Sequence, residues 1–514
     1  METRTLYWIA FVAYSLLVLG IGYHTWRRHR HRGSAVSNQT YWAADRQLSG
    51  WSVGLSISAS MMSISWSCVY GVQLFYWYGV GAIWLLIIPW LLTMAGFYLL
   101  SPRFRRMAVF SQPELLEKRF GIRSRQLLSP ALILVFTVWG GAEIYAAGIT
   151  LQPFLGLPLP WTLLIIACIV AAYSFLGGFG AVVSTDKIQF LLVAGFISLM
   201  AFLGFKGLQT HDQVLDVVQL TRLAPKSQSG IPWLFSPGPA LILITLFVYL
   251  PGWLVETDVW IRLQAARSNP EARKGIFLAA VNSLIFVGIV PMIIGLSALA
   301  IYPAINGEIP ARLQDGAFIF GAFMQDFSSS WLNLILGIGL LAASMSTVDT
   351  CGNVVALSAS YDLLEPRLKH RWSPHRLNLL SRWMSAGAIF LAFFYALFTE
   401  SLWDIFYLSS GILTTTVFLP VVAAFHPGTH SRMIHGAILF GFAGTLIFYF
   451  LESRGHLSVI EPQWLSQTGL GYIIWGFLAS ILGFLMGSRI PPHPGNLATE
   501  KDTVHHSSKG RNRS

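Results

Sequence analysis

Apolar runs of about twenty residues recur along the whole chain, separated by shorter polar segments. A helix needs about 20 residues to cross roughly 30 Å of hydrocarbon. The runs are continuous, without alternating apolar and polar positions, which excludes an outer-membrane β-barrel. The pattern predicts an all-α polytopic membrane protein with about thirteen transmembrane helices. The predicted spans are 6–26, 50–73, 79–101, 128–153, 160–176, 187–208, 238–257, 275–302, 330–360, 380–399, 402–425, 433–452 and 468–488.

The composition excludes a water-soluble enzyme. Of the 514 residues 54% are hydrophobic and 11% are charged, whereas a soluble domain carries roughly 25% charged residues. No His-rich, metal-ligand or nucleophile–base spacing stands out, so we expect neither an enzyme nor a bound cofactor. Cys68, Cys168 and Cys351 lie in apolar segments without paired spacing. We expect buried free thiols rather than disulfides or a zinc site.

The basic residues indicate orientation rather than nucleic-acid binding. The net charge is +11, but Lys and Arg are spread between the spans and form no single patch. Of the 34 Lys and Arg residues, 28 follow odd-numbered spans and 6 do not. By the positive-inside rule the N-terminus is outside and the C-terminus is cytoplasmic. We expect a plasma-membrane protein, in a bacterium the inner membrane. The first run lacks a basic leader and a cleavage site, so it predicts a retained span rather than a signal peptide.

Serines form a polar stripe on the second span. Five of them, at steps of four, four, three and four, share one helix face: Ser52, Ser56, Ser60, Ser63 and Ser67. Small residues allow close packing of membrane helices. Alternatively, the helix is partly unwound and lines an ion or substrate cavity. The stripe alone leaves both interpretations open.

The ninth span carries hydroxyl residues and a carboxylate in mid-membrane. Ala343, Ser346, Thr347 and Thr350 share a face, with Asp349 beside it. An aspartate at this depth costs roughly 2.5 to 3.5 kcal/mol, so it is usually paired, hydrated or bound to a cation. A hydrogen-bonded structural acid is the alternative.

Two further segments depart from regular helix. Glycines near 177–180 are expected to end one span, and Asp186 is expected to cap the N-terminus of the next, with ion contact as the alternative role. Pro251 and Gly252 interrupt the seventh span. A plain kink and a substrate-facing break are both compatible with this pair.

Together these segments resemble the sodium:solute symporter family, which includes bacterial proline, pantothenate, sialic acid and sugar symporters. Residues 173–186 (YSFLGGFGAVVSTD) resemble the family's Tyr-x-x-x-Gly-Gly and Thr-Asp-x-x-Gln stretch, and residues 342–349 (AASMSTVD) resemble its span-nine motif. Supporting segments follow in the family's order at 41–50, 112–121 and 262–275.

The resemblance implies a LeuT-type fold, in which five helices and an inverted five form the core. The implied organisation is a first helix with a basic cytoplasmic loop (1–49), a first repeat (50–208), a second repeat with external loops (209–425), two accessory helices (426–488) and a disordered cytoplasmic tail (489–514). Spans two and seven are then the paired broken helices.

The resemblance also implies where sodium binds. The family's conserved site maps onto the carbonyls of Ala59, Met62 and Ala343 and the side chains of Ser346 and Thr347. About five or six oxygens suit a small hard cation. A second sodium site of some members maps onto Asp186, Ser346, Asp349 and Thr350.

Departures from the family pattern concern the solute. Met61 stands where some members carry a polar residue, and Ile261-Arg262 replaces a familiar Gln-Arg pair, which argues against sugar specificity. Acids and aromatics favour a zwitterionic or cationic solute. The expected cavity residues are Ser63, Trp66, Glu143, Trp253 and Glu256. For Asp258, an i, i+4 pair with Arg262 is expected.

The sequence therefore predicts a secondary active transporter that couples inward sodium movement to the uptake of a small organic solute by alternating access. Its expected partners are sodium, the solute and the lipid bilayer, with no nucleic acid and no metal other than sodium. The alternatives are a proton-coupled carrier on the same scaffold, titrating Glu143 or Asp186, and a non-transporting membrane sensor.

Overall fold

The computed structural model describes residues 3–31, 46–177, 179–399 and 401–490. Within these ranges the elements are helices, and the β-type pairings are two isolated bridges, Leu48 with Ala266 and Ile305 with Glu308. The all-α prediction is confirmed. Residues 41–45 of the segment at 41–50, the loop 32–45 and the tail from residue 491 lie outside the described residues.

The described ranges contain ten helices long and apolar enough to cross a membrane, and a bent pair makes up an eleventh. Two shorter apolar segments, Arg4–Gly20 and Leu159–Ala172, coincide with the first and fifth predicted spans. The membrane-spanning architecture is confirmed, whereas the count of thirteen stays a prediction. The elements of the spans are α1 (Thr3–His31), α3 (Gly50–Met61) with η2 (Ile64–Tyr70), α4 (Gly71–Tyr78) and η3 (Gly79–Trp84), α5 (Ile87–Arg106), α7 (Ile122–Leu155), α8 (Leu159–Gly177), α9 (Phe179–Thr210), α11 (Pro239–Trp253) with α12 (Thr257–Ala265), α13 (Asn269–Ser283) with η5 (Leu284–Ile289) and α14 (Val290–Ile301), α16 (Ser330–Ala356) with η7 (Leu357–Leu364), α18 (Pro374–Ala396), α19 (Leu402–Ile412) with η8 (Leu413–Phe418) and α20 (Leu419–Ala423), α21 (Ser431–Ser453) and α23 (Gly471–Ser488).

The second span is broken in its middle. Helix α3 ends at Met61, and the segment from Ile64 to Trp84 continues at an angle of 55°. Ser63 is extended, with φ −77° and ψ 158°, and its side chain accepts a hydrogen bond from Trp66 N at 2.9 Å. The first turn of η2 is therefore capped by the residue that forms the break.

The seventh span breaks at residues 254–256, after its proline and glycine rather than at them. Pro251 lies inside α11, which continues to Trp253, and residues 254–256 separate it from α12. A proline removes only its own backbone donor. Leu254 N still donates to Leu250 O at 3.2 Å, so the helix persists past the proline.

Asp186 does not cap the sixth span, and that prediction is wrong. Helix α9 begins at Phe179, which places Asp186 well inside the helix. A cap carboxylate would accept bonds from the first backbone N–H groups, whereas the Asp186 carboxylate accepts bonds from side chains of three other elements. Tertiary partners therefore hold this side chain.

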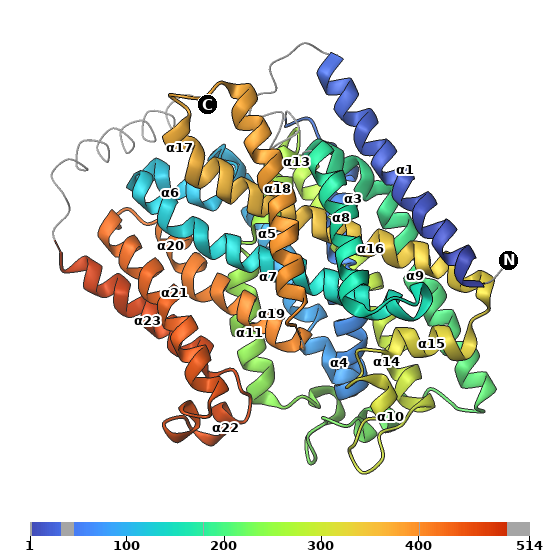
Figure 1. Cartoon of the computed structure of the whole chain (residues 1–514). Coiled ribbons are helices and arrows are strands. Elements are labelled where there is room, and N and C mark those ends of the chain that lie inside the picture. Colours follow the sequence, from blue (N-terminus) through green and yellow to red (C-terminus); the bar gives the residue numbers. More distant parts are fainter. Residues whose placement is uncertain (1–2, 32–45, 178, 400, 491–514) are drawn as a thin grey trace.

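The helices that carry the predicted site residues lie in the centre of the bundle (Figure 1). Helix α16 packs against α7, α9 and α18, and α3 packs against α9 and α13. The short helices α10 (Val217–Leu223) and α22 (Gln463–Ser466) lie at one end of the bundle, and α17 (Glu365–Leu368) lies at the other (Figure 1). The residues at the two breaks, among them Met62, Ser63, Val255 and Glu256, are buried in the protein, which an irregular backbone at membrane depth requires unless it lines a water-filled cavity.

Helices α21 and α23 form a closely packed pair at the edge of the bundle (Figure 1). Gly436 and Gly483 face each other there, and a Cβ on either would overlap the carbonyl of the other. Glycine is thus required at this crossing because the two backbones touch.

The cysteines are free thiols in the structure. Cys68 and Cys351 are buried, as expected, but Cys168 is exposed on α8. An apolar run does not distinguish the lipid-facing side of a helix from its protein-facing side, which explains the wrong assignment of Cys168.

Candidate functional site

The end of α3 places main-chain oxygens in the protein interior. Met62 leaves the helix with φ −81° and ψ 47°, and the last carbonyls of a helix lack partners within it. One of them, Ser60 O, accepts a hydrogen bond from Thr347 Oγ1 of α16 at 3.1 Å. The broken end of α3 therefore lies directly against α16.

The five residues predicted for the first sodium site come from these two helices. Ala59 and Met62 belong to the end of α3 and are fully buried. On α16, Ala343 and Ser346 are also fully buried, while Thr347 is half-buried and lines a cavity. The structure brings both sets to one helix contact. Such a contact offers uncharged oxygens, which suit a small hard cation without burying a net negative charge.

Ser346, the residue before Thr347 on α16, takes part in a hydrogen-bond network around a buried carboxylate. Asp186 of α9 is fully buried and accepts hydrogen bonds from Ser56 Oγ of α3 and from Ser346 Oγ at 2.9 Å. Arg262 Nη2 of α12 lies 3.4 Å from Asp186 Oδ2. Four elements that are distant in sequence thus meet at one carboxylate.

Arg262 is itself buried, with 1% of its side chain exposed. Its Nε donates to Ser56 Oγ at 2.8 Å and its Nη2 to Thr350 Oγ1 at 3.0 Å. Its Nη1 lies 3.4 Å from Asp258 Oδ2, which confirms the i, i+4 pair expected from sequence. Arg262 therefore joins α3, α9 and α16 in addition to its own helix.

Asp349, which was also predicted for the second sodium site, is fully buried on α16. Asp186 and Thr350 are linked through Arg262, and Ser346 bonds to Asp186. A role of Asp349 in ion binding stays a prediction.

A cavity lies beside the two helix breaks. It contains all five residues predicted for the solute, together with Ser60 and Asp258 near the network of Arg262. The complete lining is Ser60, Met61, Ser63, Ser65, Trp66, Trp90, Phe136, Trp139, Glu143, Trp253, Glu256, Asp258, Thr347, Thr350, Cys351, Phe406 and Ser410. Thr347 and Thr350 connect this cavity to the contact between α3 and α16.

Three carboxylates line the cavity, and none of its lining residues is Lys, Arg or His. Glu143 of α7 accepts hydrogen bonds from Ser65 Oγ and, at 3.3 Å, from Ser65 N, so it is tied to the second half of the broken span. Glu256 and Asp258 flank the start of α12. Ser60 Oγ donates to Asp258 Oδ2 at 3.2 Å, and Arg262 pairs with the same oxygen.

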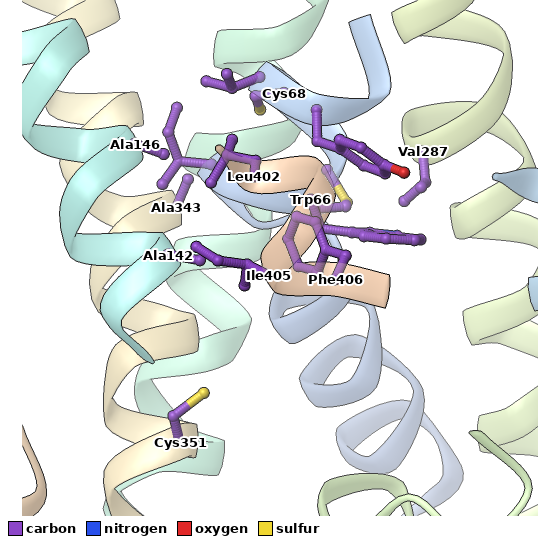
Figure 2. Close-up of a cluster of buried hydrophobic side chains, with 14 of the residues drawn as sticks. Trp66, Cys68, Ala142, Ala146, Val287, Ala343, Cys351, Leu402, Ile405 and Phe406 are labelled. Atoms are coloured by element: carbon purple, nitrogen blue, oxygen red, sulfur yellow. The ribbon is translucent and has the colours of Figure 1, made fainter. Parts of the chain in front are cut away.

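Aromatic rings also line the cavity. Trp66 meets Phe406 at 4.8 Å and Trp253 at 5.3 Å between ring centroids, both edge to face. Figure 2 shows Trp66 and Phe406 against each other, with Ala142 and Ala343 on the neighbouring helices. Trp253 stacks on Tyr249 at 4.2 Å. The cavity lining therefore combines carboxylates with aromatic rings.

Sequence reasoning did not assign Ser56, Ser65 and Asp258 to a site. The serine stripe contained a signal for Ser56, since this residue shares a face with Ser60. Ser65 lies off that stripe, and it faces Glu143 only because the helix breaks before it. Asp258 was expected only as a partner of Arg262, and its place in the cavity follows from the break at 254–256.

Comparison with known proteins gives one family. A family model described as the sodium:solute symporter family matches residues 41–431. A sodium/glucose cotransporter of Vibrio parahaemolyticus is 28% identical over 414 residues, which cover 75% of this chain and 73% of that protein. A sodium/sialic acid symporter of Aliivibrio fischeri is 24% identical over 389 residues, covering 73% of both. A human sodium/iodide cotransporter is 27% identical over 370 residues, covering 69% of this chain and 55% of that protein.

A solved structure has the same fold. It is a substrate-bound, outward-open state of a Na⁺-coupled sialic acid symporter, with a TM-score of 0.70 and 18% sequence identity. The similarity covers 95% of this chain and 98% of the other. The LeuT-type helical core expected from the sequence is confirmed.

Proposed function

Because the chain belongs to the sodium:solute symporter family, we propose that the contact between α3 and α16 holds the sodium ion that drives transport. The protein couples sodium entry to the uptake of a small solute by alternating access. It is a transporter of the plasma membrane rather than an enzyme. The proposed ligands are the carbonyls of Ala59, Met62 and Ala343 and the hydroxyls of Ser346 and Thr347.

Two observations support this sodium site. The ligand residues lie where α3 stops being helical, and Thr347 already bonds to a carbonyl of that helix end. Ser346 gives its hydroxyl proton to Asp186 at 2.9 Å, which leaves its oxygen lone pairs for the cation. Sodium would therefore fasten α3 to α16 through oxygens that both helices supply.

The bound ion would link sodium entry to the conformational cycle. A ligand shifts an equilibrium only by its differential affinity for the two states, and a site shared by α3 and α16 exists only while the two helices touch. With a membrane potential of about 100 mV and a roughly tenfold sodium gradient, one ion supplies roughly 3.7 kcal/mol. This energy supports accumulation of a neutral solute by a factor of about 500.

We further propose that the solute carries an ammonium group, as a zwitterion or a cation. The observation that carries this proposal is the cavity with Glu143, Glu256 and Asp258 in its lining and no basic side chain among its lining residues. Arg262 pairs with Asp258 from outside the lining, so Glu143 and Glu256 are the carboxylates left to pair with a ligand ammonium group. The rings of Trp66 and Trp253 add cation–π attraction.

The names of the relatives do not select a solute. Glucose, sialic acid and iodide occur among them, and these solutes differ in size and in charge. The proposal for this chain therefore rests on its own cavity.

A thermal-shift screen of the purified protein tests the proposal. The probes are lysine, proline, glycine betaine, putrescine, glucose and N-acetylneuraminate, each in sodium chloride and in potassium chloride. We expect stabilisation by amine-bearing probes, in sodium only. Stabilisation by glucose or N-acetylneuraminate alone would reject the ammonium group, and stabilisation that is equal in potassium would reject the sodium site.

We propose an orientation with the N-terminus outside and the C-terminus cytoplasmic. The bias of 28 among 34 Lys and Arg residues toward one side supports it. In this orientation α17 lies on the cytoplasmic end and α10 on the external end. Labelling of a single cysteine at exposed Glu308, in the loop that follows α14, with an impermeant maleimide on intact cells tests the orientation. Absence of labelling until the cells are permeabilised would reverse it.

A further inference from the structure

The carboxylate of Asp186 already has a cation beside it. Arg262 reaches this fully buried acid from α12, with 3.4 Å between Nη2 and Oδ2. The same guanidinium donates to Thr350 Oγ1 at 3.0 Å and to Ser56 Oγ at 2.8 Å. The guanidinium of Arg262 thus contacts oxygens of Asp186, Ser56 and Thr350 that could otherwise surround a metal ion.

The remaining hydrogen-bonding capacity of these groups is also in use. Thr350 Oγ1 donates its proton to Ser346 O at 3.0 Å, so the lone pairs of this hydroxyl face Arg262. Ser56 Oγ accepts from Arg262 and donates to Asp186. Each oxygen is oriented by the guanidinium, directly or through a neighbour.

The residues at this position differ in kind from those at the end of α3. A buried carboxylate needs a compensating charge, and in a low-dielectric interior the need is strong. A guanidinium keeps its charge in proteins and presents several fixed donors. Unlike sodium, it is tethered to α12 and cannot leave on the other side of the membrane.

We propose that Arg262 is the resident cation of the Asp186 position and excludes a second sodium ion, so that one sodium moves in each cycle. This inference rests on the proposed sodium site at α3 and α16. Arg262 is then a specificity-determining residue for the number of coupling ions. It makes no contribution to the coupling energy because its charge does not cross the membrane.

Removal of the guanidinium would open the position to sodium. In Arg262→Gln the oxygens of Asp186, Ser56, Ser346 and Thr350 would surround the space left by the guanidinium, and both Asp186 and Asp258 would lose their cationic partner. Carboxylate and hydroxyl oxygens are ligands that hard cations accept. The substitution is expected to add one sodium ion to the protein.

Equilibrium binding of radioactive sodium to the purified full-length protein tests the inference without knowledge of the solute. We expect about one ion per wild-type chain and about two per Arg262→Gln chain. Arg262→Lys, which keeps a tethered cation, is the matched control and should bind one. The double variant Arg262→Gln with Asp186→Asn should return to one, because the Asp186 carboxylate that would bind the added ion is gone.

Two ions in the wild type would overturn the inference while leaving sodium coupling intact. One ion in Arg262→Gln would also overturn it. No bound sodium in the wild type would instead reject the proposed sodium site, and this inference with it. If Arg262→Gln cannot be purified, the count in the wild type decides between one ion and two.

Discussion

Two neighbouring residues of α16 serve regions of opposite character. Thr347 bonds to a main-chain carbonyl at the end of α3, where the oxygens are uncharged. Ser346 bonds to Asp186, where a carboxylate and a guanidinium are buried together. The first region attracts a mobile cation with dipoles alone, and the second holds a fixed cation with a full charge. Neutral oxygens allow an ion to be released again, whereas a buried ion pair is costly to separate.

The strongest way to break this comparison is to remove both hydroxyls proposed as sodium ligands, that of Thr347 in the uncharged region and that of Ser346, which also bonds to Asp186. We expect Ser346→Ala combined with Thr347→Ala to weaken sodium binding by at least about 100-fold, since two of five ligands are lost and each hydrogen bond to a charged group is worth roughly 1.5 to 3 kcal/mol. Sodium-dependent uptake and radioactive sodium binding measure the effect. Ser344→Ala on the same helix is the control, because Ser344 Oγ has no hydrogen-bond partner among the described residues. Uptake with unchanged dependence on external sodium would refute the site.

The second test removes the fixed cation and measures stability. Arg262→Met leaves Asp186 buried without its partner, and loss of one member of a buried ion pair costs roughly 3 to 5 kcal/mol. We expect a large drop of the thermal midpoint in potassium buffer and a smaller one in sodium buffer. Arg267→Met is the matched control, because Arg267 and Glu271 form a pair of the same i, i+4 spacing on the surface, where the cost is below about 1 kcal/mol. An equal drop of the thermal midpoint in the two variants would show that the buried ion pair of Arg262 contributes no more to stability than the surface pair of Arg267.

The third test asks whether Glu143 of the cavity binds the solute or sodium. Glu143→Gln keeps the shape and the hydrogen-bonding side chain but removes the charge. We expect solute affinity to fall by about 10- to 100-fold, through loss of a desolvated charge–charge contact worth roughly 1.4 to 2.8 kcal/mol, with sodium affinity unchanged. Glu308→Gln, at an exposed loop position, is the control. Loss of sodium binding in Glu143→Gln would assign this acid to the ion instead.

The smallest expected effect concerns Ser60, which touches both regions. Its carbonyl accepts from Thr347, and its hydroxyl donates to Asp258 at 3.2 Å. Ser60→Ala removes only the hydroxyl, so we expect a loss of about 1 kcal/mol in the free energy of unfolding and at most about a threefold change in sodium affinity. Sodium titrations followed by thermal shift measure both quantities. A change in sodium affinity as large as that of the double variant on α16 would contradict a site built on main-chain oxygens.

The helical membrane fold was readable from the sequence because each span carries its own signal. Continuous apolar runs of sufficient length predict a transmembrane helix wherever they occur. The breaks in the second and seventh spans were expected from the family resemblance, whereas the serine stripe and the Pro251-Gly252 pair alone left other interpretations open. The exact positions of the breaks were harder to predict, since the seventh span breaks only after Trp253.

The partners of the buried acids were not readable because they lie far apart in the chain. Asp258 and Arg262 are one helical turn apart, and their pairing was predicted and confirmed. Asp186 and Arg262 are on different helices, and the local pattern around Asp186 suggested a helix cap instead. Glu143 likewise meets Ser65 across two spans. Local spacing therefore predicts contacts within a helix, whereas contacts between helices depend on the packing.

The extended residue in the second span affects how freely its two halves can reorient. Ser63 Oγ accepts a hydrogen bond from Trp66 N, so η2 has its own start, and Met62 N donates to Ser58 O at 2.9 Å and closes the last turn of α3. Among the described residues, α3 and η2 share no helical backbone hydrogen bond across Met62 and Ser63 that bending would have to break. A hinge of this kind lets α3 and η2 reorient as rigid bodies. We expect the amide protons of both helices to stay protected from deuterium exchange throughout turnover.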